Sequence, residues 1–126
     1  MTYLMGLDIS TTSAKALIID ETGKVIAVHG TPQPISQPHP LWSEQNPRDW
    51  WEGMVQSIRG ALSDAGLSGE DISAIGLTGQ MHGLVMMNAE GDVLRPSILW
   101  NDQRTQAECD LITQTIGFER LIALTG

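Results

Sequence analysis

Five of the six prolines in this 126-residue chain lie between residues 31 and 47. They are Pro32, Pro34, Pro38, Pro40 and Pro47. Each proline lacks the backbone N–H that a helix interior or a central strand needs. We therefore expect residues 31–47 to form an ordered connection over the surface, with different kinds of structure before and after it.

The residues before this connection predict an antiparallel meander. Three short apolar runs occupy residues 3–7, 14–19 and 25–28. The first two runs are separated by small residues, and each ends at a carboxylate. A turn at residues 20–23 leads into the third run, because Gly23 can adopt a positive φ there.

The residues after the connection predict a long helix and then a strand. Asn46 can cap the helix, Pro47 suits its first position, and Gly66 can end it. The expected buried stripe contains Trp50, Met54, Ile58, Ala61, Leu62 and Ala65, widened by Trp51 and Val55. Residues 72–78 are apolar on both faces, which is typical of a covered parallel strand.

The rest of the chain predicts an inserted hairpin and helices. The hairpin is expected at residues 84–94, a short strand at residues 98–100 and a last helix at residues 118–124. Between this short strand and the last helix, Asn101 or Asp102 would cap another helix, which runs to about Ile116 and stops at Gly117. The fold class is therefore α/β, with the order β-β-β-α-β followed by the hairpin and helices.

Composition limits the partners of this chain. Fifteen acidic residues against seven basic ones give a formal charge of −8, which argues against nucleic acid and against an anionic membrane surface. Backbone N–H groups can still bind a single phosphoester. Cys109 is the only cysteine, so a disulfide framework and a multi-cysteine zinc site are excluded, and its default role is a small buried side chain. With no secretory signal pattern, we expect a cytoplasmic location.

The first candidate for chemistry is Asp8 with the polar loop that follows it. The loop contains Ser10, Thr11, Thr12 and Ser13, and Lys15 comes shortly after. Such a loop offers N–H groups and hydroxyls to an anion, while Asp8 can hold a hydrated magnesium ion beside it. These are the needs of a triphosphate tail. The alternative is a hydroxyl-rich hairpin turn without a ligand.

Two more candidates follow strands. Gln80, Met81 and His82 come at the end of the predicted parallel strand, where α/β sheets bind ligands, and they offer groups that suit a sugar. Trp100 offers a flat face to sugar C–H groups, and Asp102 can accept hydroxyl hydrogen bonds. The alternatives are a His82 bonded to a neighbouring carbonyl, and a helix cap with a surface ion pair at residues 100–104.

Four stretches of the chain match one protein family in their order and spacing. They are residues 5–15 (MGLDISTTSAK), 38–47 (PHPLWSEQNP), 79–83 (GQMHG) and 94–104 (LRPSILWNDQR). Together they resemble the FGGY carbohydrate kinases and, within that family, the xylulokinases. The loop at residues 79–83 favours a xylulokinase over a glycerol kinase, whose loop carries an Arg-Glu pair. The resemblance covers essentially the whole chain.

The resemblance implies an actin-like, ribonuclease-H-like fold of two large domains that close over ATP and a sugar. The implied reaction transfers the γ-phosphoryl group of ATP, with Mg²⁺, to D-xylulose or a related sugar. By position, Asp8 would be the catalytic carboxylate, near magnesium through water. The phosphate loop would contain Ser10, Thr11, Thr12, Ser13 and Lys15, and the sugar pocket Gln80, Met81, His82, Trp100 and Asp102. The family usually has glycine where this chain has Ser10, whose side chain would narrow the approach of phosphate.

Members of this family are several times longer than this chain. We therefore expect residues 1–126 to be the N-terminal portion of the first kinase domain, inactive alone. The catalytic base and the C-terminal nucleotide domain are expected beyond residue 126. Two alternatives stay open: another FGGY kinase such as a gluconate kinase, and a non-catalytic module that binds sugar or pairs as a homodimer through open strand edges.

Overall fold

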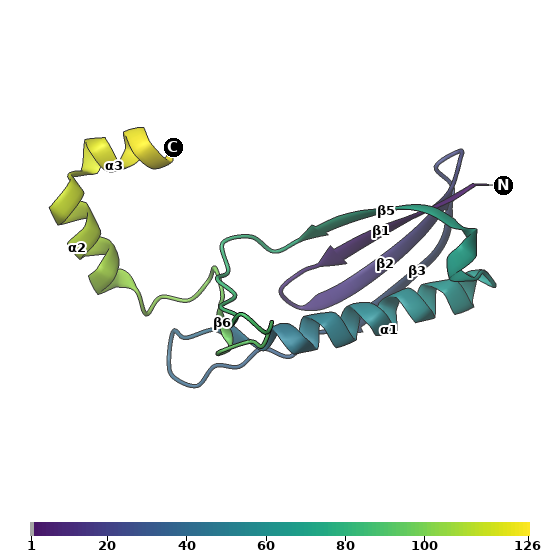
Figure 1. Cartoon of the computed structure of the whole chain (residues 1–126), viewed down its shortest axis with the longest axis horizontal. Coiled ribbons are helices and arrows are strands. Elements are labelled where there is room, and N and C mark those ends of the chain that lie inside the picture. The colour runs from purple at the N-terminus through teal and green to yellow at the C-terminus, as the bar shows by residue number, and fades with distance from the viewer. Residues whose placement is uncertain (1) are drawn as a thin grey trace.

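The computed structural model describes residues 2–126, in which a long helix covers one face of a mixed sheet (Figure 1). The sheet contains β1 (Tyr3–Ile9), β2 (Ser13–Asp20), β3 (Val25–Pro32) and β5 (Ile72–Gly79). The long helix α1 (Pro47–Ala65) and the 3-10 turn η1 (Gly69–Asp71) precede β5. The other elements are β4 (Glu44–Gln45), β6 (Ser97–Ile98), α2 (Gln106–Ile116) and α3 (Phe118–Thr125).

The sheet has the strand order β3-β2-β1-β5, which confirms the predicted meander and the β-β-β-α-β order. β1 and β2 are antiparallel, and so are β2 and β3. β5 is parallel to β1, so that Asp8 lies beside Lys15 on one neighbour and Thr78 on the other. Because parallel strands end at the same edge, the residues that follow β1 and β5 are brought together there.

The ends of α1 are those that the sequence predicts. The side chain of Asn46 accepts a hydrogen bond from the backbone N–H of Arg48, and Pro47 occupies the first turn. Gly66 ends the helix in the left-handed conformation, with φ 66°. Its N–H bonds a carbonyl of the last turn, so both ends of the helix have partners.

Small residues on α1 allow the helix to lie close to β2 and β3. The core includes Met5, Leu7, Ala14, Ala16 and Ile18 from the sheet and Met54 and Ala61 from α1. Ser57 is fully buried, and its hydroxyl donates to the carbonyl of Ala14 at 2.9 Å. A Cβ atom added at Gly60 would overlap the imidazole of His29, whose Nδ1 lies 2.9 Å from the carboxylate of Asp64.

Replacing Gly60 with alanine should therefore destabilise the protein. Overpacking against His29 costs about 1 to 3 kcal/mol, and the better helix propensity of alanine returns about 1 kcal/mol. Urea denaturation should show a net loss of about 1 kcal/mol. In a His29→Ala background the ring is gone, so the same change should stabilise the protein. An equal loss in both backgrounds would contradict the close packing of this helix.

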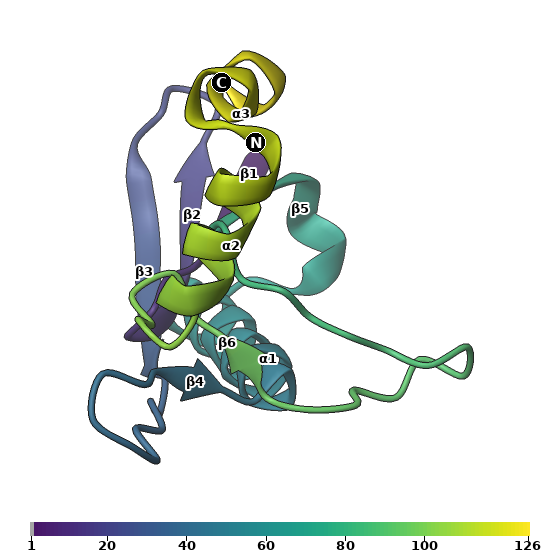
Figure 2. The same cartoon turned by 90° about the vertical axis from the view of Figure 1, so that its left-hand side faces the viewer.

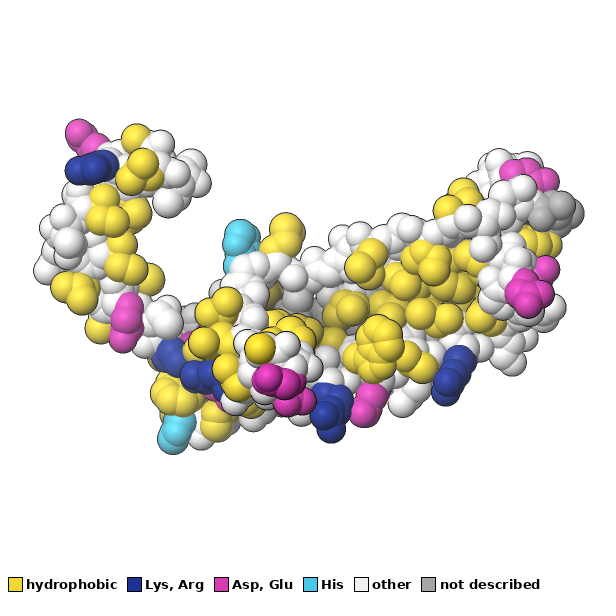
Figure 3. All heavy atoms as spheres, viewed as in Figure 1, with side chains coloured by type: hydrophobic (Ala, Val, Ile, Leu, Met, Phe, Trp, Pro, Cys, Tyr) yellow, Lys and Arg dark blue, Asp and Glu magenta, His cyan; other side chains and the backbone are white. Residues whose placement is uncertain are grey.

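The helix-facing side of β5 remains uncovered within residues 2–126, because α1 packs mainly on β2 and β3. The side chains of Ile75 and Leu77 are exposed. Hydrophobic side chains gather between β5 and α1 on this face (Figure 3). The prediction of a parallel strand is confirmed, and both of its apolar faces are exposed within residues 2–126. Trp51 is 72% exposed, so its predicted place in the core is wrong.

The proline-rich connection is ordered but is more than a surface crossing. It contains β4, which pairs antiparallel with β6 in a small second sheet. Ser43 and Gln45 are buried there. The expectation of an entirely superficial segment is therefore wrong at its C-terminal end. The predicted hairpin at residues 84–94 is present as a turn with a single bridge between Met87 and Val93.

The C-terminal helices extend away from the sheet (Figures 1 and 2). α2 begins at Gln106, after Thr105, so the expected helix cap at Asn101 or Asp102 is wrong. Cys109 lies on α2 and is exposed, so its expected burial is wrong as well. Gly117 ends α2 with φ 88°, as predicted. No helix within residues 2–126 combines the length and apolar character needed to cross a membrane.

Candidate functional site

Three segments that are distant in the sequence meet at the hydroxyl of Thr11. Thr11 lies in the loop between β1 and β2, Gln80 follows β5, and Trp100 follows β6. The Oγ1 atom of Thr11 lies 3.1 Å from Oε1 of Gln80. The indole Nε1 of Trp100 donates to the same Oγ1 at 3.1 Å. The structure therefore brings the three segments singled out in the sequence into one place.

The buried side chain of Gln45 connects these segments, a role that the sequence analysis missed. Its side chain is almost fully buried, at 2% exposure. Its Nε2 donates to the carbonyl of Thr11 at 2.7 Å and to that of Pro34 at 2.9 Å. Its Oε1 accepts from Nε2 of Gln80 at 2.9 Å and from Nε1 of Trp50 at 3.0 Å. Trp50, expected in the core, is half-buried and serves as a hydrogen-bond donor to this glutamine.

Asp8 lies beside this meeting point, on the sheet face opposite α1. Met5 and Leu7 pack against the helix, so the alternation of side chains along β1 turns Asp8 to the other face. A hollow of about 570 Å³ lies there, lined in part by Asp8, Lys15 and Thr78. Within residues 2–126 the carboxylate of Asp8 has no hydrogen-bond partner, so it is available to a ligand.

The loop after β1 is closed by its own serines. The backbone N–H and the hydroxyl of Ser10 both donate to the carbonyl of Ser13, each at 2.9 Å. The two serine hydroxyl oxygens lie 3.2 Å apart. Thr12 is exposed, and its carbonyl accepts from the N–H of Gln33. These bonds hold the ends of the loop together and leave the side chain of Thr12 on the surface.

Met81 and His82 are exposed at the end of β5. Met81 is 72% exposed. His82 has a positive φ of 66°, which is unusual for a residue with a side chain. Its imidazole has no hydrogen-bond partner within residues 2–126, so the alternative of a histidine bonded to a neighbouring carbonyl does not describe this structure. Both side chains are open to a ligand, although no direct bond joins them to Thr11.

Asp102 lies in the same region but its carboxylate is already occupied. Its Oδ2 accepts from the backbone N–H of Ser43 at 2.6 Å and from Nη2 of Arg104 at 2.6 Å. Its Oδ1 accepts from the backbone N–H of Arg104. The Arg104 side chain holds the pKa of the Asp102 carboxyl well below its usual range. Asp102 therefore fixes the backbone at Ser43 and at Arg104, and its predicted contact with sugar stays a prediction.

The guanidinium of Arg104 extends this cluster to the second sheet. Its Nη1 lies 2.6 Å from Oε1 of Glu44, and the group stacks over the ring of Trp42 at 3.7 Å. The Arg104 side chain is 11% exposed and that of Asp102 is 1% exposed. The alternative predicted for residues 100–104 was a surface ion pair. The pair is present, but it is buried.

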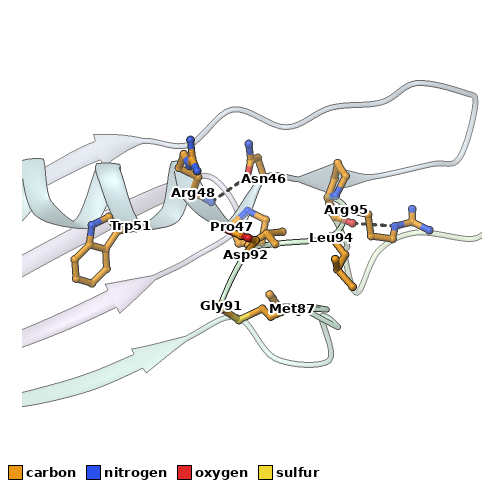
Figure 4. Close-up of a pocket in the computed structure, with 12 residues that line it drawn as sticks. Asn46, Pro47, Arg48, Trp51, Met87, Gly91, Asp92, Leu94 and Arg95 are labelled. Atoms are coloured by element: carbon orange, nitrogen blue, oxygen red, sulfur yellow. Dashed lines mark hydrogen bonds between the residues drawn. The ribbon is translucent and has the colours of Figure 1, made fainter. Parts of the chain in front are cut away.

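A second hollow of about 720 Å³ lies between the start of α1 and residues 85–96 (Figure 4). Arg48 and Trp51 line it from the helix, and Met87 and Leu94 line it from the opposite segment. The residues that the sequence singled out for phosphate or sugar do not line it. This hollow is therefore separate from the meeting point at Thr11.

Comparison with known proteins places the chain in a family. Residues 3–126 match the family described as "FGGY family of carbohydrate kinases, N-terminal domain". The chain belongs to the FGGY family of carbohydrate kinases. Xylulose kinase from Escherichia coli K12 is 41% identical to it over 118 residues, which are 94% of this chain and 24% of that protein.

Solved structures of FGGY kinases have the same fold. Xylulose kinase from Rhodospirillum rubrum has a TM-score of 0.86 at 32% identity and is covered over 93% of this chain and 24% of that one. Gluconate kinase from Lactobacillus acidophilus has a TM-score of 0.82 at 26% identity, over 96% of this chain and 24% of that one. The expected actin-like fold is therefore confirmed. The chain spans about a quarter of the length of these relatives.

Ser10 stands where the family resemblance leads us to expect glycine. Among residues 2–126, the residues other than glycine with a positive φ are Leu41 and His82. The backbone at Ser10 therefore does not need the left-handed conformation that favours glycine. Its hydroxyl is turned to the carbonyl of Ser13. A serine is compatible with this loop, while the expected narrowing of the phosphate approach stays a prediction.

Proposed function

We propose that this chain is the N-terminal part of an ATP-dependent sugar kinase that converts D-xylulose to D-xylulose 5-phosphate. The meeting of three predicted segments at Thr11 carries the proposal, because a phosphate loop and a sugar loop must lie side by side for phosphoryl transfer. Similarity to a xylulose kinase at 41% identity supports this sugar over others. A loop at residues 79–83 with Met81 and His82 agrees with that choice.

In this proposal the loop after β1 and the hollow beside it receive the phosphates. Lys15 and the N–H groups of Thr11 and Thr12 would bind the phosphate oxygens, and Asp8 would lie near the transferring group. Within residues 2–126, no three acidic, histidine or cysteine side chains cluster as metal ligands. Mg²⁺ keeps most of its waters and takes few protein ligands, so in this proposal Asp8 would contact it through water.

The sugar would lie beyond the end of β5. Met81 and His82 are exposed there, and the indole of Trp100, which is 61% exposed, offers an apolar face. The hydroxyl of the sugar attacks phosphorus, the bond from phosphorus to the ADP oxygen breaks, and the hydroxyl proton leaves with a base. We expect that base beyond residue 126.

Phosphorylation of a panel of sugars by the full-length enzyme tests the proposal. Coupled ADP release should show the highest kcat/KM for D-xylulose, with gluconate and glycerol well below it. A preference for gluconate would establish the second candidate, which the similarity to a gluconate kinase structure favours. Absence of phosphorylation with every sugar would contradict the proposal and favour a non-catalytic module.

Replacing His82 with alanine should weaken sugar binding and should leave the handling of ATP unchanged. A polar contact to the sugar contributes about 1 to 3 kcal/mol, so the sugar KM should rise about 5- to 160-fold. ATP hydrolysis without sugar should stay unchanged, because His82 lies outside the phosphate loop. Steady-state kinetics with each substrate varied in turn measure both effects. An unchanged sugar KM would remove His82 from the sugar pocket.

A further inference from the structure

The side-chain amide of Gln45 uses every hydrogen bond that it can make. Its NH₂ group donates to the carbonyls of Thr11 and Pro34, at 2.7 Å and 2.9 Å. Its carbonyl oxygen accepts from the indole of Trp50 at 3.0 Å and from Gln80 at 2.9 Å. An amide has two donor hydrogens and two acceptor lone pairs, so all four are occupied. Since carbonyls only accept and an indole N–H only donates, the amide can have only this orientation.

The bond from Gln45 fixes one peptide group of the loop between β1 and β2. Within residues 2–126 there is no cis peptide bond, so the carbonyl of Thr11 and the N–H of Thr12 point in opposite directions from their shared peptide group. The carbonyl of Thr11 faces the buried amide of Gln45. The N–H of Thr12 therefore points away from the buried side of the loop.

The N–H of Thr12 is available to a ligand. Within residues 2–126 it donates to no protein acceptor, and Thr12 is exposed. The next peptide group is fixed as well, because the backbone N–H of Gln33 donates to the carbonyl of Thr12 at 2.9 Å. That bond comes from the backbone at position 33, whereas the bond to the Thr11 carbonyl comes from a side chain. The direction of the Thr12 N–H therefore depends on which side chain stands at position 45.

We propose that Gln45 is a positioning residue of the phosphate loop. It holds the carbonyl of Thr11 inward and so directs the N–H of Thr12 toward a phosphate oxygen of ATP. A phosphate oxygen is charged and accepts hydrogen bonds, so a donor that already points at it binds it without the cost of turning the peptide. The inference rests on the proposed kinase function. It concerns backbone groups alone and leaves the hydroxyl of Thr11 in the phosphate loop.

Gln45→Met in the full-length enzyme tests the positioning role. Methionine has a similar volume and makes none of the four hydrogen bonds. The Thr11–Thr12 peptide loses its anchor, so the ATP KM should rise about 10-fold, the size expected for one hydrogen bond to a charged group. The sugar KM should stay within about threefold, because the side chains that bind sugar in the proposed function are unchanged. An unchanged ATP KM, or an equal rise in both KM values, would overturn the proposal.

Gln33→Met is the matched control. Gln33 is another buried glutamine, at 7% exposure, but its side-chain amide has no hydrogen-bond partner within residues 2–126. The variant keeps the backbone N–H that bonds Thr12. The ATP KM should therefore stay within about twofold of the wild-type value. An equal rise at positions 33 and 45 would show a general effect of altering this core and would contradict the positioning role.

Trp50→Phe tests the same role if Gln45→Met does not fold. Phenylalanine keeps an aromatic ring at this half-buried position and lacks the indole N–H that donates to Gln45. The amide then loses one of its four partners, so the ATP KM should rise about threefold with an unchanged sugar KM. An ATP KM equal to that of the wild type would show that the amide does not act through its orientation.

A readout without sugar separates this inference from the proposed function. In ligand-free protein labelled at threonine, the ¹⁵N resonance of Thr12 should shift in Gln45→Met, because that nitrogen shares its peptide group with the Thr11 carbonyl. Gln33→Met should move it far less. A non-hydrolysable ATP analogue should bind about 10-fold more weakly in Gln45→Met alone.

The outcomes for the two proposals are distinct. Both changes in a protein that phosphorylates no sugar would support the positioning role while the kinase proposal fails. Unchanged binding of the ATP analogue in Gln45→Met, or an unmoved Thr12 resonance, would overturn the positioning role, whatever the activity.

Discussion

Asp8→Asn in the full-length kinase should lower kcat by about 100-fold or more and leave the sugar KM within about threefold. The side chains have the same shape, so that binding of the sugar is preserved. In the proposed function, the change removes a negative charge beside the transferring phosphoryl group, where an interaction acts mainly in the transition state. Initial rates with D-xylulose and ATP each varied in turn measure the two parameters separately.

Asp20→Asn is the matched control, because Asp20 is the carboxylate that ends β2. It accepts hydrogen bonds from Thr22 and Lys24 in the turn before β3. The change there should cost stability and leave kcat near the wild-type value. A normal kcat in Asp8→Asn, with only the sugar KM raised, would show that Asp8 binds sugar and does not take part in phosphoryl transfer.

Arg104→Ala should cause the largest loss of stability, about 3 kcal/mol. The side chain pairs with Asp102 and Glu44 within a buried cluster, and its removal leaves the Asp102 carboxylate without its main partner. Denaturant unfolding of the full-length protein measures the loss. Arg95→Ala is the control: Arg95 bonds the same Glu44 but is half-exposed, so its removal should cost less than about 1 kcal/mol. Equal losses at the two arginines would contradict the burial of this cluster.

The same cluster predicts how stability depends on pH. The folded state lowers the pKa of Asp102, chiefly through Arg104. Its contribution is therefore complete above the unfolded value near 3.8 and is lost as the pH falls below it. The wild-type protein should lose this contribution progressively as the pH falls from about 4 to 2 and below. Arg104→Ala should show a smaller loss over that range.

Local patterns in the sequence were sufficient for much of the fold. The meander followed from short apolar runs and a glycine turn, and α1 followed from Asn46 and Gly66 at its ends. Trp51 was placed in the core because it widens an apolar stripe on the helix. The structure exposes it because α1 lies across β2 and β3. Which strands a helix covers is a tertiary property that periodicity along one segment does not contain.

The sequence predicted which segments form the site. It did not predict the hydrogen bonds that connect them. Thr11, Gln80 and Trp100 were found because loops after strands are common ligand sites. Gln45 was missed, since its partners lie up to 35 residues away and one glutamine in a polar stretch carries no local signal. Asp102 was expected to cap a helix. Its carboxylate instead accepts from Ser43 and Arg104, and a distant N–H and a nearby guanidinium are stronger partners than a helix end.

His82 has a left-handed backbone conformation, which lowers stability for a residue with a side chain. That conformation costs a residue with a Cβ roughly 1 kcal/mol of conformational free energy, whereas glycine adopts it without strain. Selection for thermal stability alone would therefore favour glycine here, next to Gly83. In the proposed function the imidazole of His82 contacts the sugar, and this contact would offset the strain. Engineers who stabilise this kinase by removing unfavourable backbone conformations should leave position 82 unchanged.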